Sequence, residues 1–318
     1  MTLDNIVDEI KKAENIVILT HEGPDGDAIG SSLGMYLALK QLGKEADVVI
    51  PIHSKIYDYL PEIEKLKTIG KTEPYDLAIA LDCGDIKRLN GFSNYFEDAK
   101  TKIVIDHHAI NTMFGDYNFV NPVAPATTEI LVTLFEYLGV ELTKEIGICL
   151  CTGIITDTGG LKYSNVTAET FEFMARFVNK GINVSQIFRK ALELVSEERF
   201  NLTKIAVNRL ELLENKKIAY TYITLEDQKN TNSQEGDHEG IVYFGRDIEG
   251  VEVSIFLRET EKGIKASLRS NDYVNVADIC LFFGGGGHIK AAGCTIQGTL
   301  EQAKEKIIKE VSMHIKGK

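Results

Sequence analysis

The sequence predicts an α/β protein with a first domain built on a parallel sheet flanked by helices, a smaller second α/β domain, and a cleft between the two. From residue 15 to about 110, short apolar runs alternate with amphipathic segments, which is typical of a parallel sheet buried on both faces. Beyond about residue 200, runs rich in β-branched and aromatic residues predict a second set of strands. A chain of 318 residues is long enough for two hydrophobic cores. We therefore expect domains over residues 1–185 and 201–318, joined by a helical linker over residues 186–200.

The first half of the chain alternates predicted strands and helices. The expected strands are NIVILT (15–20), ADVVIP (46–51), DLAIAL (76–81) and KIVI (102–105), and the amphipathic segments between the first three are SSLGMYLALKQLG (31–43) and YDYLPEIEKLK (57–67). Four segments with helical periodicity follow, at 126–139, 143–157, 166–181 and 182–193. Gly139 and Gly181 stand where helix C-caps are expected.

The second half begins with a charged segment, 196–213, that we expect to be a helix. Strands are then predicted at 217–225, 251–259, 264–270 and 291–296, helices at 274–283 and 299–315, and a mobile loop in the polar stretch 227–240.

The composition argues against a protein that binds long duplex DNA and against one that spans a membrane. The formal net charge is −12, with 47 acidic and 35 basic residues, whereas a protein that grips long duplex DNA through its phosphates usually has a basic surface. A polyanionic ligand is therefore expected to be short. No apolar run approaches the roughly 20 residues of a spanning helix, and the charged, amphipathic start is unlike a signal peptide, so we expect a cytoplasmic protein without a membrane partner. The five cysteines contain no CxxC pair, which favours buried free thiols.

Acidic and imidazole side chains follow several of the predicted strands. His21, Asp25 and Asp27 follow the first strand, Asp82 follows the third, Asp106, His107 and His108 follow the fourth, and Asp157 follows the apolar segment CTGIIT. A single aspartate in such a place is more often a helix cap or turn residue. Several at the same edge of a parallel sheet converge on one crevice, where ligands of such sheets bind.

The four carboxylates of Asp25, Asp27, Asp82 and Asp157 could not all stay ionised in one crevice without cations. Two divalent ions would balance their charge. Mixed imidazole and carboxylate ligands suit Mn²⁺, with Co²⁺ or Fe²⁺ as alternatives, while Mg²⁺ prefers shells made only of oxygen. Paired divalent ions are the device of phosphatases and nucleases, so the sequence predicts hydrolysis of phosphoesters.

At these residues the sequence resembles the DHH phosphoesterase superfamily, named for the triplet that stands here as Asp106-His107-His108. Its other motifs stand here as HEGPDGDAIGS (21–31), LDCGD (81–85) and TDTG (156–159). The resemblance implies that one ion binds His21, Asp25 and Asp82 and that the other binds Asp27, Asp82, His107 and Asp157, so that Asp82 bridges the two. It also implies that His108 lies beside the scissile phosphate and stabilises or protonates it.

A glycine-rich segment, FGGGGHIKAAGC (283–294), lies in the second domain. It matches neither a Walker loop nor a dinucleotide fingerprint. Such a run lets a backbone approach an anion closely, whereas a tight turn alone would need one or two glycines. The segment resembles the GGGH signature of the DHHA1 domain, which binds substrate phosphate and base. That resemblance implies substrate contacts by Gly284, Gly285, Gly286, Gly287 and His288, with Arg269 and Ser270 as partners and Arg246 and Arg258 as further candidates.

Arg88, six residues beyond Asp82, is also a candidate for the substrate phosphate, although a surface role fits its position equally well. Chain length and motifs narrow the superfamily further. RecJ exonucleases carry an additional oligonucleotide-binding region, membrane-bound cyclic-dinucleotide enzymes carry spanning segments, and family II pyrophosphatases have a different second domain. The compact type that remains is similar to nanoRNase/pAp phosphatases.

We therefore expect a Mn²⁺-dependent phosphodiesterase and phosphatase that acts on short RNA oligonucleotides and nucleotide phosphates, such as pApA and 3′-phosphoadenosine 5′-phosphate (pAp). The expected catalytic residues are Asp82 and His108. One alternative is a phosphodiesterase for cyclic di-AMP or linear dinucleotides, and another is a catalytically silent nucleotide or metal sensor. A Rossmann-like dehydrogenase is disfavoured because the glycine fingerprint is absent. The resemblance also suggests a homodimer.

Overall fold

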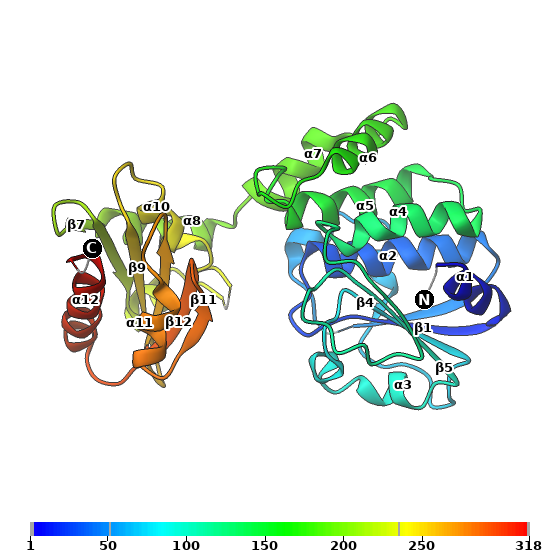
Figure 1. Ribbon diagram of the computed structural model, residues 1–318, viewed down its shortest axis with the longest axis horizontal. Coiled ribbons are helices and arrows are strands. Elements are labelled where there is room, and N and C mark those ends of the chain that lie inside the picture. Colours follow the sequence, from blue (N-terminus) through cyan, green and yellow to red (C-terminus); the bar gives the residue numbers. More distant parts are fainter. Residues whose placement is uncertain (1–2, 51, 235, 317–318) are drawn as a thin grey trace. The chain divides into compact units, whose positions relative to one another are not determined.

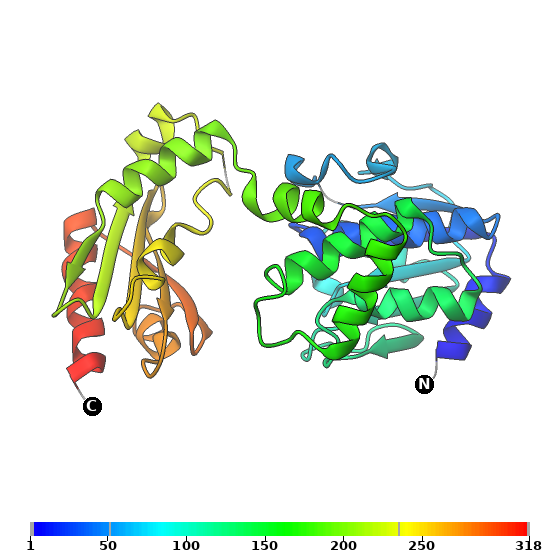
Figure 2. The ribbon, with the colours of Figure 1, turned by 90° about the horizontal axis from the view of Figure 1, so that it is seen from above.

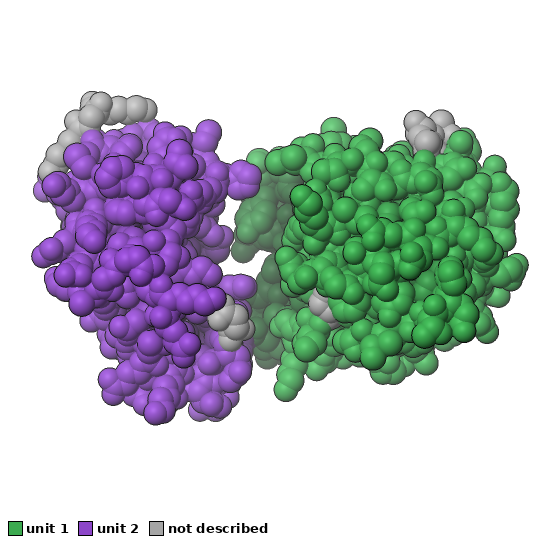
Figure 3. All heavy atoms as spheres, turned by 90° about the horizontal axis from the view of Figure 1, so that it is seen from below, with its two compact units in different colours: residues 1–194 green, residues 195–318 purple. Residues whose placement is uncertain are grey.

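The computed structural model describes residues 3–50, 52–234 and 236–316. The chain forms two compact units, Met1–Leu194 and Val195–Lys318 (Figure 3). Residues 186–200, which we expected to be a helical linker, contain the end of one short helix, a π-helical turn and the start of the next helix. The expected strand at 46–51 ends in Pro51, and the expected loop at 227–240 includes Glu235. Both of these residues lie outside the described ranges.

The first unit is built on a six-stranded sheet in which every neighbouring pair is parallel, in the order β3-β2-β1-β4-β5-β6. The strands are β1 (Asn15–Leu19), β2 (Glu45–Val49), β3 (Leu66–Lys67), β4 (Leu77–Leu81), β5 (Thr101–Asp106) and β6 (Tyr117–Val120). The register pairs Ile18 with Ile79 and Ile79 with Ile103, so the carboxyl ends of β1, β4 and β5 lie side by side. The predicted parallel sheet is therefore confirmed.

Helices cover both faces of this sheet (Figures 1 and 2). They are α1 (Leu3–Lys12), α2 (Gly26–Gln41), η1 (Lys55–Tyr57), η2 (Ile63–Lys65), η3 (Ile86–Leu89), α3 (Ser93–Glu97), α4 (Thr127–Leu138), α5 (Lys144–Asp157), α6 (Ala168–Asn179), α7 (Val184–Phe188) and the π-helical turn η4 (Arg189–Glu193). Side chains alternate along β1: Ile16 and Ile18 enter the core beneath α2, α4 and α5, while Val17 and Leu19 enter the core on the α3 side. This double burial explains why the strands are apolar throughout.

The amphipathic segment 57–67 does not form the helix that its pattern predicts. It forms the end of η1, the single turn η2 and the two-residue strand β3. Pro61 lies in the middle of the segment, where it lacks an N–H donor and disfavours a helical conformation at Leu60, and Glu62 has a left-handed backbone with φ of 61°. The proline therefore outweighs the apolar periodicity.

Glycines allow α2 and α5 to pack closely. A Cβ atom at Gly30 would lie 2.5 Å from the backbone oxygen of Cys149, and one at Gly26 would lie 2.4 Å from the Thr156 side chain. On α5, a Cβ at Gly153 would lie 2.4 Å from Asp27 Oδ1. The two helices are therefore held at a distance that no side chain at these positions would permit.

The second unit is a mixed sheet in the order β11-β12-β10-β9-β8-β7, with helices packed against it (Figure 1). Its strands are β7 (Glu211–Leu213), β8 (Ile218–Ile223), β9 (Val253–Thr260), β10 (Gly263–Ser270), β11 (Gly286–His288) and β12 (Ala291–Ile296), and its helices are α8 (Glu197–Asn208), α9 (Leu225–Asn230), α10 (Ile241–Arg246), α11 (Val276–Phe282) and α12 (Leu300–Lys316). Only β8 and β9 pair in parallel; the other pairs are antiparallel. The predicted second α/β domain is confirmed.

Two boundaries in this unit differ from expectation. The charged helix predicted over 196–213 ends at Asn208, and its last residues form β7. The polar stretch 227–240 begins as helix α9, because Thr224 and Asp227 form a reciprocal capping box at its start. All five cysteines are buried free thiols, as expected. Within the described ranges, no helix is long and apolar enough to cross a membrane.

Candidate active site

The carboxyl ends of three neighbouring strands and two helix ends bring the predicted metal ligands of the first unit together. His21 lies two residues after β1, Asp82 directly follows β4, and β5 ends in Asp106, with His107 and His108 next. Asp25 caps α2 by accepting hydrogen bonds from the backbone N–H groups of Asp27 and Ala28, each at 3.1 Å. Asp157 is the last residue of α5.

One group of donors consists of His21, Asp25 and Asp82, whose ligand atoms all lie within 4.8 Å of one another. His21 Nε2 lies 3.6 Å from Asp82 Oδ2. Its other ring nitrogen, Nδ1, donates to the backbone oxygen of Glu22 at 2.8 Å. This hydrogen bond leaves the lone pair of Nε2 directed at the carboxylates, which is the arrangement that a metal-binding imidazole requires.

A second group consists of Asp27, His107 and Asp157, again within 4.8 Å of one another. His107 Nε2 lies 3.3 Å from Asp157 Oδ2 and 3.5 Å from Asp82 Oδ1. Asp82 thus contacts residues of both groups, one through each carboxylate oxygen. The two groups correspond to the two ligand sets that the resemblance to the DHH superfamily implies, and Asp82 stands between them.

The backbone of Asp82 is unusual. Its φ angle of 54° lies in the left-handed region, where residues other than glycine are uncommon. Thr127 Oγ1 donates to Asp82 Oδ1 at 3.1 Å, and the backbone N–H of Asp82 donates to Ile105 of the neighbouring strand at 3.0 Å. Strained backbone of this kind gathers at functional sites, because the surrounding structure must hold it in place.

Asp27 is completely buried and is held by the start of α4. Its Oδ2 accepts a hydrogen bond from the backbone N–H of Thr127 at 2.6 Å, and its Oδ1 accepts from the backbone N–H and the hydroxyl of Thr128 at 2.9 and 2.6 Å. From the sequence, these threonines were predicted only as residues of a helix. The sequence did contain a signal for this contact: a pair of threonines at a helix start, where free N–H groups bind anions.

Asp106 is in neither of these groups, nor in a third group of possible ligands formed by Asp82, His107 and His108, although it belongs to the DHH triplet. Its side chain is completely buried. Asp106 Oδ1 accepts from His108 Nδ1 at 2.7 Å and from the backbone N–H of His107 at 2.8 Å, and Oδ2 accepts from Asn111 Nδ2 at 2.6 Å. Asp106 therefore orients His108, whose side chain is the most exposed of the three.

Burial and mutual repulsion disfavour the ionised form of the clustered carboxyls. Burial and the charge of Asp82 raise the pKa of Asp25, and they raise the pKa of Asp27 well above its usual value. Burial raises the pKa of Asp157 to about 6. When carboxylates lie this close together, their negative charges repel one another. Bound cations stabilise the ionised form of such a cluster.

The pKa values of His107 and His108 are raised as well, which favours the charged form of these side chains. Burial lowers the pKa of His107, but the hydrogen bond to Asp157 and the charges of Asp27 and Asp82 outweigh it and raise the pKa to about 10. The hydrogen bond to Asp106 raises the pKa of His108. The donor set of imidazoles and carboxylates fits divalent cations, because a cation would replace the protons that this cluster otherwise attracts.

Arg88 lies beside this cluster. Its Nη2 is 3.1 Å from His21 Nδ1, and its backbone oxygen accepts from the N–H of Glu22 at 2.7 Å. The structure therefore places the Arg88 side chain next to a predicted metal ligand.

In the second unit, the glycine-rich segment connects α11 to the edge strand β11. Gly284 has a φ of 74° and Gly287 a φ of 146°, while a Cβ at Gly285 would lie 2.3 Å from the backbone oxygen of Gly293. Three of the four glycines thus have a structural reason, and Gly286 is the one with neither a positive φ nor a crowded neighbour. Gly286 and His288 are exposed on β11. The segment does form a turn into a strand, but it is a turn that demands more glycines than the one or two expected.

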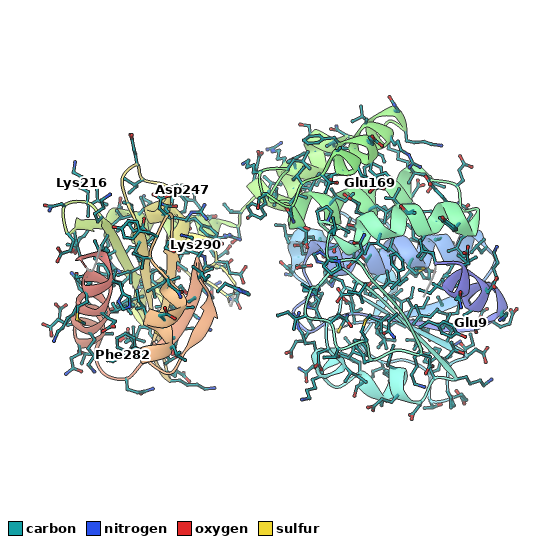
Figure 4. The ribbon with its side chains drawn as sticks, in the orientation of Figure 1. Glu9, Glu169, Lys216, Asp247, Phe282 and Lys290 are labelled. Carbon is teal, nitrogen blue, oxygen red and sulfur yellow. The ribbon has the colours of Figure 1, made fainter. Side chains whose placement is uncertain are left out.

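Arg269 lies near the end of β10 beside an aromatic ring. Its Cζ is 5.3 Å from the centroid of the Tyr243 ring, its Nε lies 3.5 Å from the Tyr243 hydroxyl, and its Nη1 donates to the oxygen of Leu268 at 2.9 Å. Arg246 stacks on the same ring at 4.4 Å and pairs with Asp247, which is labelled in Figure 4. Tyr243 was not among the residues predicted from the sequence.

Ser270 differs from the other predicted contacts. It is buried, and its hydroxyl donates to the oxygen of Val274 at 2.7 Å, within the protein. Lys290, also labelled in Figure 4, donates to the backbone oxygen of Asp272 and so ties the end of the glycine segment to the loop after Ser270. Arg258 is buried as well. Among the predicted contacts of this unit, Gly284, Gly286, Gly287 and His288 are exposed, and Arg269 is partly buried.

Comparisons with known proteins match a different family model to each of the two units. The model of the DHH family N-terminal domain matches residues 15–154, and that of the DHHA1 domain matches residues 215–317. The bifunctional oligoribonuclease and PAP phosphatase NrnA of Thermus thermophilus is 36% identical over 96% of this chain and 92% of that protein. The protein of the same description from Bacillus subtilis is 24% identical over 92% of each chain.

Among solved structures, the chain is similar to the crystal structure of an exopolyphosphatase-related protein from Bacteroides fragilis. The TM-score is 0.89 and the sequence identity is 30%, and the match covers 98% of this chain and 95% of that one. The similarity therefore extends over both units.

Proposed function

Because this chain belongs to the DHH family, we propose that it is a phosphoesterase that hydrolyses short oligoribonucleotides and pAp with the help of two divalent cations. The observation that carries the proposal is the position of Asp82 between two groups of metal-binding side chains. The substrates are inferred from the descriptions of the Thermus and Bacillus relatives.

The proposed metal ligands are those that the sequence predicts: His21, Asp25 and Asp82 for one cation, and Asp27, Asp82, His107 and Asp157 for the other. Mn²⁺ is the proposed ion because imidazole and carboxylate ligands are mixed here. When bound, such a pair of ions lowers the pKa of a water molecule and stabilises charge on the phosphoryl oxygens. The protein's own part is to hold the carboxylates ionised and the imidazoles with a lone pair facing inward.

His108 is the proposed general acid. Its Nδ1 is occupied by Asp106 at 2.7 Å, so Nε2 is the atom left to deliver a proton to the departing ribose oxygen. A positioned acid of this kind contributes about 10²–10⁴-fold to a rate. Arg88, which lies beside His21, is proposed to contact the substrate phosphate.

We propose that the second unit supplies contacts to the rest of the substrate through Arg269, Gly284 to Gly287 and His288. A guanidinium held against an aromatic ring retains N–H groups for a phosphate, and the exposed edge strand β11 offers backbone N–H donors. Ser270 is proposed to shape the adjoining loop, since its hydroxyl is already used. The net charge of −12 favours a short polyanion over long duplex DNA.

The domain limits 1–185 and 201–318, with a linker over 186–200, are part of the proposal. A homodimer and a cytoplasmic location stay predictions from the sequence.

The test is a hydrolysis panel in Mn²⁺ with identification of products. The substrates are pApA, a trinucleotide RNA, a fifteen-nucleotide RNA, pAp, cyclic di-AMP and pyrophosphate. Asp82→Ala serves as the inactive reference, and Asp85→Ala serves as the matched control because Asp85 caps η3 and belongs to neither ligand group.

We expect the short RNAs and pAp to be cleaved well ahead of the fifteen-nucleotide RNA, with Asp85→Ala active and Asp82→Ala silent. Preferential turnover of cyclic di-AMP would assign a cyclic-dinucleotide phosphodiesterase. Turnover of pyrophosphate alone would contradict the proposed role of the second unit, and tight nucleotide binding with no turnover of any substrate would indicate a sensor.

A further inference from the structure

Asn111 joins the loops that follow β4 and β5. Its Nδ2 donates to Asp106 Oδ2 at 2.6 Å and to the backbone oxygen of Cys83 at 3.1 Å. Its Oδ1 accepts from the backbone N–H of Met113 at 2.7 Å. Asn111 therefore contacts the loop that carries Asp82 and, at the same time, the carboxylate that orients His108.

The two oxygens of Asp106 have different partners. Oδ1 accepts from His108 Nδ1 and from the backbone N–H of His107, while Oδ2 accepts from Asn111. A carboxylate is planar, so a short hydrogen bond to one oxygen fixes the direction in which the other oxygen points. Because the Asp106 side chain is completely buried, no solvent molecule is expected to take the place of Asn111 easily.

We propose that Asn111 is a positioning residue for His108: by holding the Asp106 carboxylate, it fixes the imidazole so that Nε2 faces the departing oxygen of the substrate. This inference rests on the proposed phosphoesterase function. The geometry is a chain of three side chains, Asn111 to Asp106 to His108, with donor–acceptor distances of 2.6 and 2.7 Å.

Asn111 also has contacts that would serve a purely structural role, since it links Cys83 to Met113 through backbone groups. The two roles make different predictions. Loss of a loop contact would slow every substrate by the same factor. Loss of His108 positioning would slow only those substrates whose leaving group needs a proton.

The experiment compares two substrates that differ in the leaving group. In pApA the leaving group is a ribose hydroxyl, which must be protonated as it departs. In a p-nitrophenyl ester of a nucleoside 5′-phosphate the leaving group is a much stronger acid and departs as the anion. The variants are Asn111→Ala, which removes all three hydrogen bonds, and Asn111→Asp, which has the same shape and keeps the acceptor for Met113 but has no amide donor for Asp106.

Asn118→Ala is the matched control. Asn118 is another partly buried asparagine that lies nearby in the sequence, and it makes two hydrogen bonds, both with Gly115, at 3.0 and 2.7 Å. His108→Ala provides the reference for complete loss of the acid. Mn²⁺ binding and thermal unfolding are measured for each variant to confirm that the fold and the metal site persist.

We expect both Asn111 variants to lose about tenfold or more in kcat with pApA but at most about twofold with the p-nitrophenyl ester, part of the range that general acids supply. Asn118→Ala should leave the ratio of the two rates as in the wild type. If Asn111→Ala fails to fold, Asn111→Asp decides the question.

An equal loss on both substrates, or no loss with pApA, would overturn the inference. So would a His108→Ala variant that slows both substrates equally, because His108 would then not protonate the leaving group. A wild-type protein that cleaves neither substrate would instead contradict the proposed function itself.

Discussion

Asp27 and Thr128 are joined by two hydrogen bonds, although they lie 101 positions apart in the sequence: the backbone N–H and the hydroxyl of Thr128 both donate to Asp27 Oδ1. Asp27 is completely buried, and burial together with the charge of Asp82 raises its pKa well above the usual value. Donors from the start of α4 oppose that shift. The helix start thus helps to keep a proposed metal ligand ionised.

Thr128→Val tests this support, because valine has the shape of threonine but no hydroxyl. Loss of one donor to a buried carboxylate is expected to destabilise the protein by about 1–3 kcal/mol and to weaken Mn²⁺ binding. Thr128→Ser, which keeps the hydroxyl, should behave much more like the wild type. Chemical denaturation and Mn²⁺ titration measure the two effects, and equal losses in both variants would show that the hydroxyl is unimportant.

Asp82→Asn should remove activity and metal-induced stabilisation together. The amide keeps the size of the side chain and tolerates the left-handed backbone, but it cannot bridge two cations as a carboxylate does. We expect kcat to fall by more than the roughly 10–100-fold that changes outside the ligand shell typically cost.

Thermal unfolding with and without Mn²⁺ provides the second measurement for Asp82→Asn. A ligand at about 100 times its Kd stabilises a protein by about 2.7 kcal/mol, so the wild type should melt at a higher temperature in Mn²⁺, and the variant should gain much less. Asp85→Asn is the control. A variant stabilised as strongly as the wild type would argue that Asp82 is not a ligand.

Glu129 on α4 should make stability depend on pH. Burial raises its pKa to about 7, and its Oε2 has no hydrogen-bond partner among the described residues. An acid with a raised pKa in the folded state contributes stability that is present below its unfolded value, near 4.5, and that is lost as the pH rises through about 7.

Glu129→Gln removes this titration. Relative to the wild type, the variant should gain up to about 3 kcal/mol in the free energy of unfolding between pH 4.5 and pH 8. Denaturation curves over this range measure the gain, with Glu136→Gln, an exposed glutamate of the same helix, as the control. Parallel curves for wild type and Glu129→Gln would contradict the prediction.

Arg269→Ala should mainly raise KM for short RNA. A charge-assisted hydrogen bond to phosphate is worth about 1.5–3 kcal/mol, which corresponds to an increase of about 10–100-fold in KM, while kcat should change little. Arg269→Lys keeps the charge but not the planar fork and should lie in between. Lys304→Ala, which removes a positive charge of α12 that is paired with Glu211 of β7, is the control, and an equal effect of Lys304→Ala would indicate a general charge effect.

The sequence predicted the parts of the site that are local in the chain. Strand ends are marked by a change from apolar to charged residues, so the sequence alone was enough to place His21, Asp82 and His107 at one edge of the sheet. The support for these residues was not predicted, because Thr128 and Asp27 meet only through tertiary packing. Asn111 was missed for the same reason, since an asparagine directly after an alanine-isoleucine pair carries no local signal of what it contacts.

Where the predicted fold differs from the structure, the causes can be identified. The pattern of residues 57–67 suggested a helix, but Pro61 and the left-handed Glu62 prevent it. The glycine segment was interpreted from the number of its glycines, whereas backbone crowding against Gly293 already accounts for Gly285. A count of glycines therefore overstates how much of such a segment is free to contact a ligand.

The wide spacing of the proposed ligands also bears on how the protein would acquire its metal in the cell. The donors come from separate stretches between His21 and Asp157, and the group that contains Asp157 is complete only after α5 has been synthesised and has packed against α2. We therefore expect both cations to be held only once the first unit has folded. The ion that fills the site is then selected from whatever the surroundings supply at that moment, and growth conditions that change the supply of manganese and iron should change the metal content of the purified protein.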